Sequence, residues 1–294
     1  MKKQRQLKQV IDSVQTLEGG GFPIRRPFPT RTMNYFDPFL LFDHMGPVDW
    51  PPNQAIGAPD HPHRGFETVT YMLEGHMQHK DSHGNKGDLN PGDVQWMTAG
   101  AGIVHSELPR EDFLKSGGVM NGIQLWVNLP AEKKMTRPRY QDIPSDKLPT
   151  ATSADGKVWV RVIAGESMGV NAVIDTHIPI IYLHFKIQPG GQVTQSIPDG
   201  LNAFLYILTG QLTIADSENA VTEAQMAVLS EGDAVRVSVP AQASEEASFV
   251  LLAGPPLNEP VARYGPFVMN TQREIYQAIE DFRAGRMGEI APEL

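Results

Sequence analysis

The feature that most constrains the fold is a series of short apolar runs, each bounded by glycine, proline or polar residues. They lie at 67–75, 93–99, 122–129, 158–165, 179–187, 203–215, 234–239 and 248–254. The runs are rich in Val, Ile, Leu, Tyr and Phe, and the 27 glycines and 24 prolines of the chain supply turn residues between them. Closely spaced short strands are typical of sandwiches and barrels. We therefore predict an all-β fold.

One segment near the C-terminus departs from this pattern and predicts a helix. Thr271 and Glu274 have the spacing of a capping box, and the residues that follow them have helical periodicity. Gly285 suits the C-terminal end of such a helix. We expect one short C-terminal helix at about 271–285.

The length of 294 residues corresponds to about two typical domains. A polar stretch marked by proline, taken as 141–156, has little strand pattern and is interpreted as a linker. This divides the chain into an N-terminal domain, 1–140, and a C-terminal domain, 157–294, which carries the helix.

An internal repeat supports the division into two domains. Residues 61–75 align with 196–210, matching Gly65 with Gly200 and Tyr71 with Tyr206. Downstream, LNPGD aligns with LSEGD. The chain therefore uses one β unit twice.

Composition excludes several classes of function. The chain has no cysteine, so a bound metal must be held by nitrogen and oxygen atoms. The net charge is −9 and Lys and Arg are scattered, which argues against direct nucleic-acid binding. No apolar run has the length of a signal peptide or a membrane span. We therefore expect a soluble, cytoplasmic protein without membrane contact.

The residues that carry chemistry are two pairs with the same spacing. Residues two apart on a strand share a face, so His61, His63 and Glu67 fall on one face of the strand that they begin. His105 and Glu107 have the same relation after a glycine-rich bend. Imidazoles with a carboxylate suit Fe, Mn, Ni, Cu or Zn and leave positions open for substrate. This joint pattern predicts a metal site.

The second repeat has lost these residues. His61 and His63 align with Ser196 and Pro198, and the downstream alignment places Glu245 and Ala247 opposite His105 and Glu107. If the histidines bind a metal in the first unit, the second unit can keep the same β structure without them. The metal site is therefore predicted in the first unit alone.

The other histidines and most aromatic residues are assigned ordinary roles. His76, His79 and His83 lie in a polar hairpin and are expected to be solvated, and His44 is expected in the core or a turn. The aromatic residues considered for a pocket beside the metal, with core packing as the favoured role, are Phe36, Phe39, Phe42, Phe66 and Trp96.

Four long strings resemble one known family. They are HPHRGFETVTYMLEG, GDVQWMTAGAGIVHSE, DPFLLFDHMGP and LNEPVARYGPFVMNT, and they closely resemble the pirin family of the cupin superfamily. The resemblance implies a bicupin, two jelly-roll β-barrels facing each other, with one mononuclear metal in the N-terminal barrel.

The resemblance also assigns the metal ligands, which map onto His61, His63, His105 and Glu107. Fe(II) is the expected metal, with Mn, Ni, Cu and Zn as alternatives. The general cupin motif would instead use Glu67, and its spacing fits this chain less well because only three residues separate Gly57 from His61. Glu67 is therefore expected to orient a ligand imidazole from outside the ligand set.

Two functions are compatible with these residues, beside a structural or storage role. The first is a dioxygenase resembling quercetin 2,3-dioxygenase, which takes a flavonol-like aromatic substrate and O2, with Glu107 as a general base. The second is a regulator that contacts a protein partner, a transcription factor or a metabolic enzyme, according to the iron oxidation state, with Arg25, Arg26 and Arg31 as a candidate patch. Since two paired barrels replace the dimer of single cupins, a monomer is expected.

Overall fold

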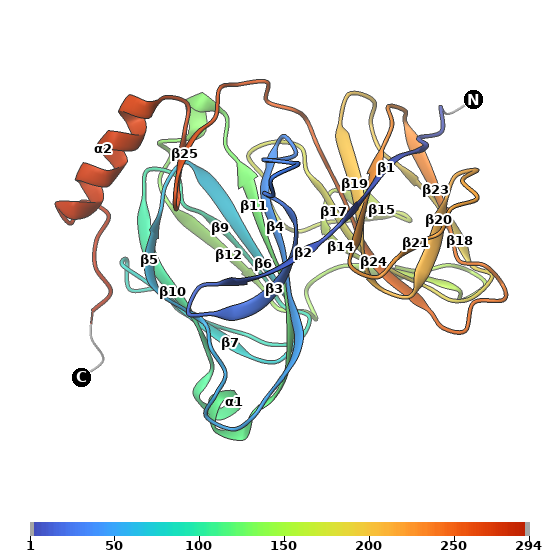
Figure 1. Cartoon of the computed structure of the whole chain (residues 1–294), viewed down its shortest axis with the longest axis horizontal. Coiled ribbons are helices and arrows are strands. Elements are labelled where there is room, and N and C mark those ends of the chain that lie inside the picture. Colours follow the sequence, from blue (N-terminus) through green and yellow to red (C-terminus); the bar gives the residue numbers. More distant parts are fainter. Residues whose placement is uncertain (1–2, 292–294) are drawn as a thin grey trace. The chain divides into compact units, whose positions relative to one another are not determined.

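The computed structural model describes residues 3–291, which form two compact β units (Figure 1). The N-unit comprises residues 15–35, 39–145 and 257–291, and the C-unit comprises residues 3–14, 36–38 and 146–256. Strands dominate both units, so the all-β prediction is confirmed. Neither α-helix of this range is long and apolar enough to cross a membrane.

The N-unit contains a seven-stranded and a four-stranded antiparallel sheet and one short strand pair. In spatial order, the large sheet is β12 (Arg139–Ile143), β9 (Val94–Thr98), β6 (Phe66–Glu74), β11 (Gly118–Asn128), β4 (Phe39–Trp50), β3 (Phe22–Phe28) and β2 (Val14–Glu18). The small sheet is β5 (Ala58–His63), β10 (Ile103–Pro109), β7 (Met77–Asp81) and β8 (Lys86–Leu89), and the pair is β25 (Ala262–Tyr264) with β26 (Phe267–Met269).

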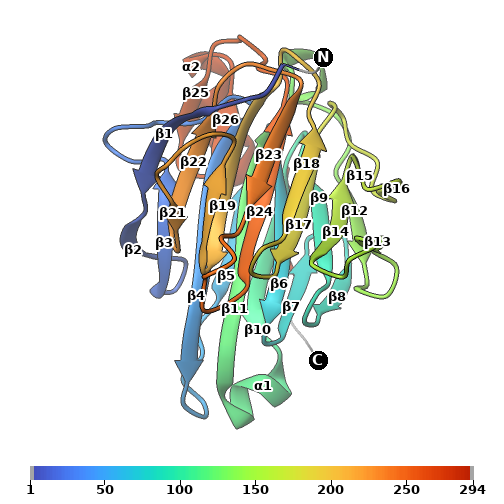
Figure 2. The same ribbon diagram turned by 90° about the vertical axis from the view of Figure 1, so that its right-hand side faces the viewer.

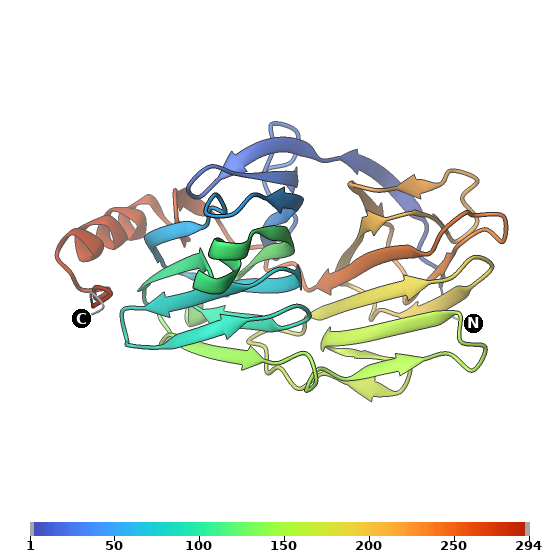
Figure 3. The ribbon, with the colours of Figure 1, turned by 90° about the horizontal axis from the view of Figure 1, so that it is seen from below.

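The helical elements also belong to the N-unit. The expected C-terminal helix is α2 (Gln272–Arg283), and its capping box is present, because Glu274 N donates to Thr271 Oγ1 and Thr271 N donates to Glu274 Oε2. A helix that the sequence analysis missed, α1 (Glu111–Ser116), follows β10 and is the short green helix in Figure 3. A 3₁₀ turn, η1, covers Ala131–Lys133.

The C-unit repeats this arrangement of sheets. Its large sheet is β1 (Leu7–Asp12), β22 (Gln225–Leu229), β19 (Asn202–Thr209), β24 (Ala247–Gly254), β17 (Ile181–Ile187), β14 (Val158–Ala164) and β13 (Thr150–Thr152). Its small sheet is β18 (Gln192–Ser196), β23 (Ala234–Ser238), β20 (Gln211–Ile214) and β21 (Val221–Thr222), and β15 (Glu166–Ser167) pairs with β16 (Val170–Asn171).

Each unit takes a segment from the opposite end of the chain. β1, the dark blue strand in Figure 2, pairs with β22 of the C-unit, whereas residues 257–291 belong to the N-unit. The structure thus groups residues 3–14 with the C-unit and residues 257–291 with the N-unit, whereas the sequence suggested the domains 1–140 and 157–294. β12 begins before the expected linker and extends into it. Edge strands are placed by hydrogen bonds to distant strands, which a local apolar pattern does not reveal.

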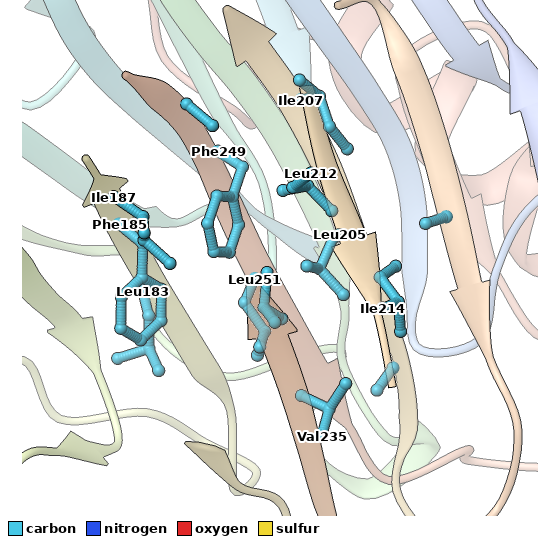
Figure 4. Close-up of a cluster of buried hydrophobic side chains, with 14 of the residues drawn as sticks. Leu183, Phe185, Ile187, Leu205, Ile207, Leu212, Ile214, Val235, Phe249 and Leu251 are labelled. Carbon is cyan, nitrogen blue, oxygen red and sulfur yellow. The ribbon is translucent and has the colours of Figure 1, made fainter. Parts of the chain in front are cut away.

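The interior of the C-unit is apolar. Leu205 and Leu251 from the large sheet and Leu212 and Val235 from the small sheet are fully buried and lie in one cluster (Figure 4). The rings of Phe185 and Phe249 stack there with centroids 5.3 Å apart. Each such side chain contributes about 1.5–3 kcal/mol on burial. The C-unit interior is thus a packed core.

The matching layer of the N-unit is polar. In the C-unit, Leu205 lies opposite Ala227 and Leu251 on the neighbouring strands. In the N-unit, the repeat places Thr70 at this position, opposite Gln95 and Gln124. The same topology therefore encloses an apolar core in one unit and hydrogen-bonding groups in the other.

The strand register also corrects the downstream part of the repeat alignment. β10 pairs with β5 and places His105 opposite His61, whereas β23 pairs with β18 and places Ala234 opposite Ser196. The C-unit equivalent of His105 is therefore Ala234 rather than Glu245. The alignment of LNPGD with LSEGD was wrong by one strand, because the two turns connect different strand pairs.

Gly65 is required where the C-terminal segment joins the N-unit. Arg64 O accepts a hydrogen bond from Val268 N, and the buried Lys134 ammonium donates to the carbonyl oxygens of both Gly65 and Val268. Gly65 has a φ of +91°, and a Cβ there would lie 2.0 Å from Val268 O. A side chain at this position would push the C-terminal segment away.

Gly65→Ala is expected to lower the free energy of unfolding more than Gly84→Ala. Gly84 has a similar φ of +82°, but a Cβ there meets no atom within 4 Å, so this control isolates the backbone strain from the clash. We expect the clash to add about 1–3 kcal/mol of destabilisation. Denaturant unfolding of both variants measures the difference, and equal losses would contradict the close packing of residues 257–291 on this turn.

His184 is a buried histidine of the C-unit. It lies on β17, and its Nε2 is 2.8 Å from Ser248 Oγ. Burial, together with the smaller effect of the nearby Lys186 and Arg161 charges, lowers the pKa of His184 to about 3. The folded state therefore holds a neutral imidazole at pH values where an unfolded chain would protonate it.

The native state is expected to lose stability as the pH falls from about 6.5 to about 3, because only the unfolded state gains a proton on His184 in that window. The loss reaches about 1.4 kcal/mol per pH unit. His184→Gln should flatten this part of the stability profile, whereas substitution of the exposed His83 should not. Urea unfolding across the window tests this, and an unchanged slope in His184→Gln would contradict it.

Candidate metal centre

Three histidines converge in the N-unit. His61 and His63 end β5, and His105 lies directly opposite His61 on β10. The ring centroids of His61 and His105 are 4.4 Å apart, and one ligand nitrogen from each of the three rings lies within 4.8 Å of the others. The strand pairing thus brings together three of the residues that the sequence singled out.

Burial keeps two of these imidazoles neutral. His105 is fully buried and His63 is 2% exposed. Desolvation lowers the pKa of His63 and of His105 well below the ordinary value, and the neighbouring histidines of the cluster lower both further. A neutral imidazole is the form that binds a metal ion, so the protein holds these side chains in the ligating state.

The nitrogen atoms of the cluster fit a bound cation. Neither ring nitrogen of the buried His105 has a hydrogen-bond partner, and Nδ1 of His63 has none, within the residues that the structure describes. His61 Nδ1 lies 2.7 Å from Pro59 O, which leaves its Nε2 available. Buried polar atoms without a partner are costly, and a coordinated metal would satisfy them. The donor set therefore fits a divalent transition metal held by three imidazoles.

Glu107 lies in the same cavity but outside the cluster of ligand atoms within 4.8 Å. The register of β10 on β5 shifts between His105 and Glu107, so Glu107 pairs with Ala58. Its Oε1 accepts a hydrogen bond from Thr70 Oγ1 at 2.8 Å, and its Oε2 lies 3.5 Å from Gln124 Nε2. The polar layer of the N-unit therefore orients the Glu107 carboxylate.

Glu67 also lies outside the cluster. It is fully buried, and its Oε1 accepts a hydrogen bond from Thr98 Oγ1 at 2.7 Å. This hydrogen bond joins Glu67 to the residue directly opposite it on the neighbouring strand β9. Its expected role of orienting a ligand imidazole stays a prediction.

A cavity of about 520 Å³ opens beside the histidines. His61, His63 and Glu107 line it together with apolar residues, of which the largest are Phe22, Leu41, Met45, Met77 and Trp126. The aromatic residues suggested by the sequence are absent from this lining; of these, Phe39, Phe42, Phe66 and Trp96 are fully buried, as the core role predicts.

Sequence reasoning missed the cavity residues Trp126 and Arg263. The Trp126 ring lies 5.2 Å from the His63 ring, and the Arg263 guanidinium lies 4.8 Å above the Trp126 ring. Trp126 lies on a predicted strand. The alternating pattern of that strand indicates which face of the sheet a side chain is on, but it does not show that the side chain lines a cavity. Arg263 comes from the C-terminal segment, whose position depends on tertiary contacts.

The C-terminal segment is tied to the metal motif itself. Arg64, the residue after His63, is 4% exposed and its Nη1 donates to Asp281 Oδ2 on α2 at 2.6 Å. Its Nε donates to Ala101 O, and a parallel bridge joins it to Phe267. Contacts with residues far apart in the sequence thus hold the end of β5, which carries His61 and His63, in place.

Two assignments of the sequence analysis were wrong. His79 is 1% exposed rather than solvated, because the alternation of β7 turns Met77, His79 and Asp81 inward. Arg26 is not part of an exposed patch: it forms two hydrogen bonds of 2.6 Å with Asp43 and an ion pair with Glu18. His44 is buried and its Nε2 lies 2.9 Å from Asn121 Oδ1, as expected of a core histidine.

Two jelly-roll units, one of which carries the histidine cluster, define a bicupin with a candidate metal site in one unit. Among residues 3–291 no other group of three such side chains could hold an ion. The chain matches the model of the pirin family over residues 21–127 and that of the pirin C-terminal cupin domain over residues 182–288.

The full-length comparisons agree. The chain is 45% identical over 283 residues to a pirin-like protein of Solanum lycopersicum, which covers 96% of this chain and 92% of that protein. It is 45% identical over 274 residues to pirin of Homo sapiens, covering 92% and 90%. A crystal structure of quercetin 2,3-dioxygenase from Acinetobacter baumannii has a TM-score of 0.91 and 38% identity, covering 98% and 100%. The chain belongs to the pirin family.

His105→Ala is expected to weaken metal binding about 100-fold or more. Loss of a residue that only hydrogen-bonds a metal ligand already lowers metal affinity about 10- to 100-fold, and loss of the ligand itself should cost more. His76→Ala serves as the matched control, because His76 is half-buried and lies outside the cluster. Metal content after dialysis, with titration calorimetry, measures the effect. Retention of the metal at wild-type affinity in His105→Ala would remove this residue from the ligand set.

Proposed function

We propose that the protein is a metal-dependent dioxygenase that cleaves a flavonol or a similar enolisable aromatic substrate with O2, as a quercetin 2,3-dioxygenase does. The observation that carries the proposal is the three-histidine cluster at an apolar cavity of about 520 Å³. This volume suits a flat aromatic compound, since ligand sites of about 300–1,000 Å³ are typical. Similarity to the Acinetobacter baumannii enzyme supports it.

His61, His63 and His105 would hold the metal, with Glu107 as a further ligand, and Fe(II) is the proposed ion among Fe, Mn, Ni, Cu and Zn. When bound, the metal supplies Lewis-acid chemistry that favours ionisation of the substrate hydroxyl. The net reaction consumes one flavonol and one O2 and releases carbon monoxide and the ring-opened ester.

Glu107 is proposed to accept the substrate hydroxyl proton. A general base needs a carboxylate within hydrogen-bond reach of that proton, and Glu107 lines the cavity beside the histidines. Thr70 donates to its Oε1, so the more weakly bonded Oε2 is the atom that can take the proton. Leu41, Met45 and Trp126 contribute apolar surface to the cavity, against which an aromatic substrate would pack.

Glu107→Gln is expected to retain measurable metal and to lose about 10²–10⁴ in turnover, the usual contribution of a general base. The assay is anaerobic loading with Fe(II), Mn(II), Ni(II) or Cu(II), followed by quercetin and O2, with quercetin absorbance and carbon monoxide as readouts. Glu111→Gln is the control, because Glu111 is exposed and pairs with Lys115 on α1.

Each result separates the alternatives. Carbon monoxide release that depends on the metal and is lost in His61→Ala would support the dioxygenase. Turnover unchanged in Glu107→Gln would remove Glu107 from the base role. Tight metal binding without turnover for every ion would contradict the enzyme proposal and favour the alternative, an iron-dependent regulator that binds a protein partner.

A further inference from the structure

Arg263 is a cation in the wall of the metal cavity that the proposed chemistry leaves unused. It lies on β25, labelled in Figure 1, and its Cζ is 4.8 Å from the centroid of the Trp126 ring. Measured between centroids, the same ring also lies 5.2 Å from the His63 ring and 4.3 Å from the Phe66 ring. Trp126 is therefore a shared neighbour of the Arg263 guanidinium and of the histidine cluster.

The guanidinium has few protein partners. Of the five N–H donors of an arginine, Arg263 uses Nη1 for one long hydrogen bond of 3.3 Å to Leu40 O. No carboxylate of residues 3–291 forms an ion pair with it. Asp43 and Glu18, which also line the cavity, are both bound by Arg26 at 2.6 Å.

The position of Arg263 is electrostatically unusual. It is half-buried, and desolvation, together with the charge of Arg26, lowers its pKa. It is the only lysine or arginine among the cavity-lining residues in the described range. The contact with the Trp126 ring uses none of the N–H groups of the guanidinium. The N–H edge of a guanidinium can bind a carboxylate or a similar oxyanion through two hydrogen bonds.

We propose that Arg263 binds an anionic substituent of the ligand, so that the cavity selects aromatic anions. The preferred ligand has an oxygen pair that faces the histidines at one edge and an oxyanion at the far end of the ring system, beside Arg263. This inference rests on the proposed function for the oxygen pair, but the anion contact depends only on the cavity and on Arg263. Arg263 is thus a specificity residue of the cavity.

The first test compares two ligands of the same shape. They are 3-hydroxyflavone with a 4′-sulfonate and 3-hydroxyflavone with a neutral 4′-methyl sulfone, titrated without O2 into the metal-loaded protein. Arg263→Met should weaken the sulfonate about tenfold, the loss of one charge-assisted contact, and the sulfone less than about twofold. The affinity of Arg263→Lys for the sulfonate should lie between those of the wild type and Arg263→Met, because lysine keeps the charge and lacks the planar N–H edge.

The matched control is Arg161→Met. Arg161 also lies over a tryptophan, with its Cζ 5.5 Å from the Trp159 ring, but this pair belongs to the C-unit, whose described residues form no histidine cluster. The control should leave both affinities unchanged. Equal losses for the two flavones in Arg263→Met, or no loss for either, would overturn the inference.

A second pair of probes separates this inference from the flavonol proposal. Naphthalene-2-sulfonate and 2-(methylsulfonyl)naphthalene lack the flavonol oxygen pair, and the sulfonate is a poor metal ligand. A selective loss of naphthalene-2-sulfonate binding in Arg263→Met, with no flavone bound by wild type, would sink the flavonol proposal and keep the anion site. Absence of sulfonate binding to wild type, or no effect of Arg263→Met on it, would overturn the anion site.

Discussion

The antiparallel register between β5 and β10 is the constraint on which the chemistry of the protein depends. It places His105 opposite His61, and its shift after His105 alters the position of Glu107 along the strand. Bulges of this kind re-aim side chains next to active sites. A slip of one residue would turn the whole set to the other face of the sheet. The histidine cluster is therefore a product of strand pairing, and the neutral state of its buried rings follows from the burial that the pairing creates.

The two units show how one topology serves two purposes. Where the C-unit has Leu205 opposite Leu251, the N-unit has Thr70 opposite Gln124. The apolar layer of the C-unit contributes stability through burial. The polar layer of the N-unit gives up that contribution, and in return its hydroxyl and amide groups hold the Glu107 carboxylate at the cavity. The difference between a packed core and a functional cavity thus lies in a few interior side chains and leaves the order of the strands unchanged.

The C-terminal segment completes the N-unit. It reaches the metal motif through the Arg64–Asp281 ion pair and the buried Lys134 ammonium, which joins the carbonyl oxygens of Gly65 and Val268. The same segment carries Arg263 to the Trp126 ring. The contacts that hold Arg64 and Gly65, the residues after His63, therefore also hold the segment that places Arg263 in the cavity wall. One set of tertiary contacts therefore supports both the histidine cluster and the position of Arg263.

The sequence by itself determined the all-β class, central strands of both units, the C-terminal helix, the duplication and the three histidines that converge. These features are written in local patterns: alternation with a period of two, a capping box and a repeated string around Gly65. Only the tertiary structure decided which chain end completes which unit, that His79 is buried, that Arg26 is held by Asp43 and Glu18, and that Trp126 and Arg263 line the cavity. The physical reason is that edge-strand pairing, ion pairs and cation–π contacts join residues whose separation along the chain leaves no local signal.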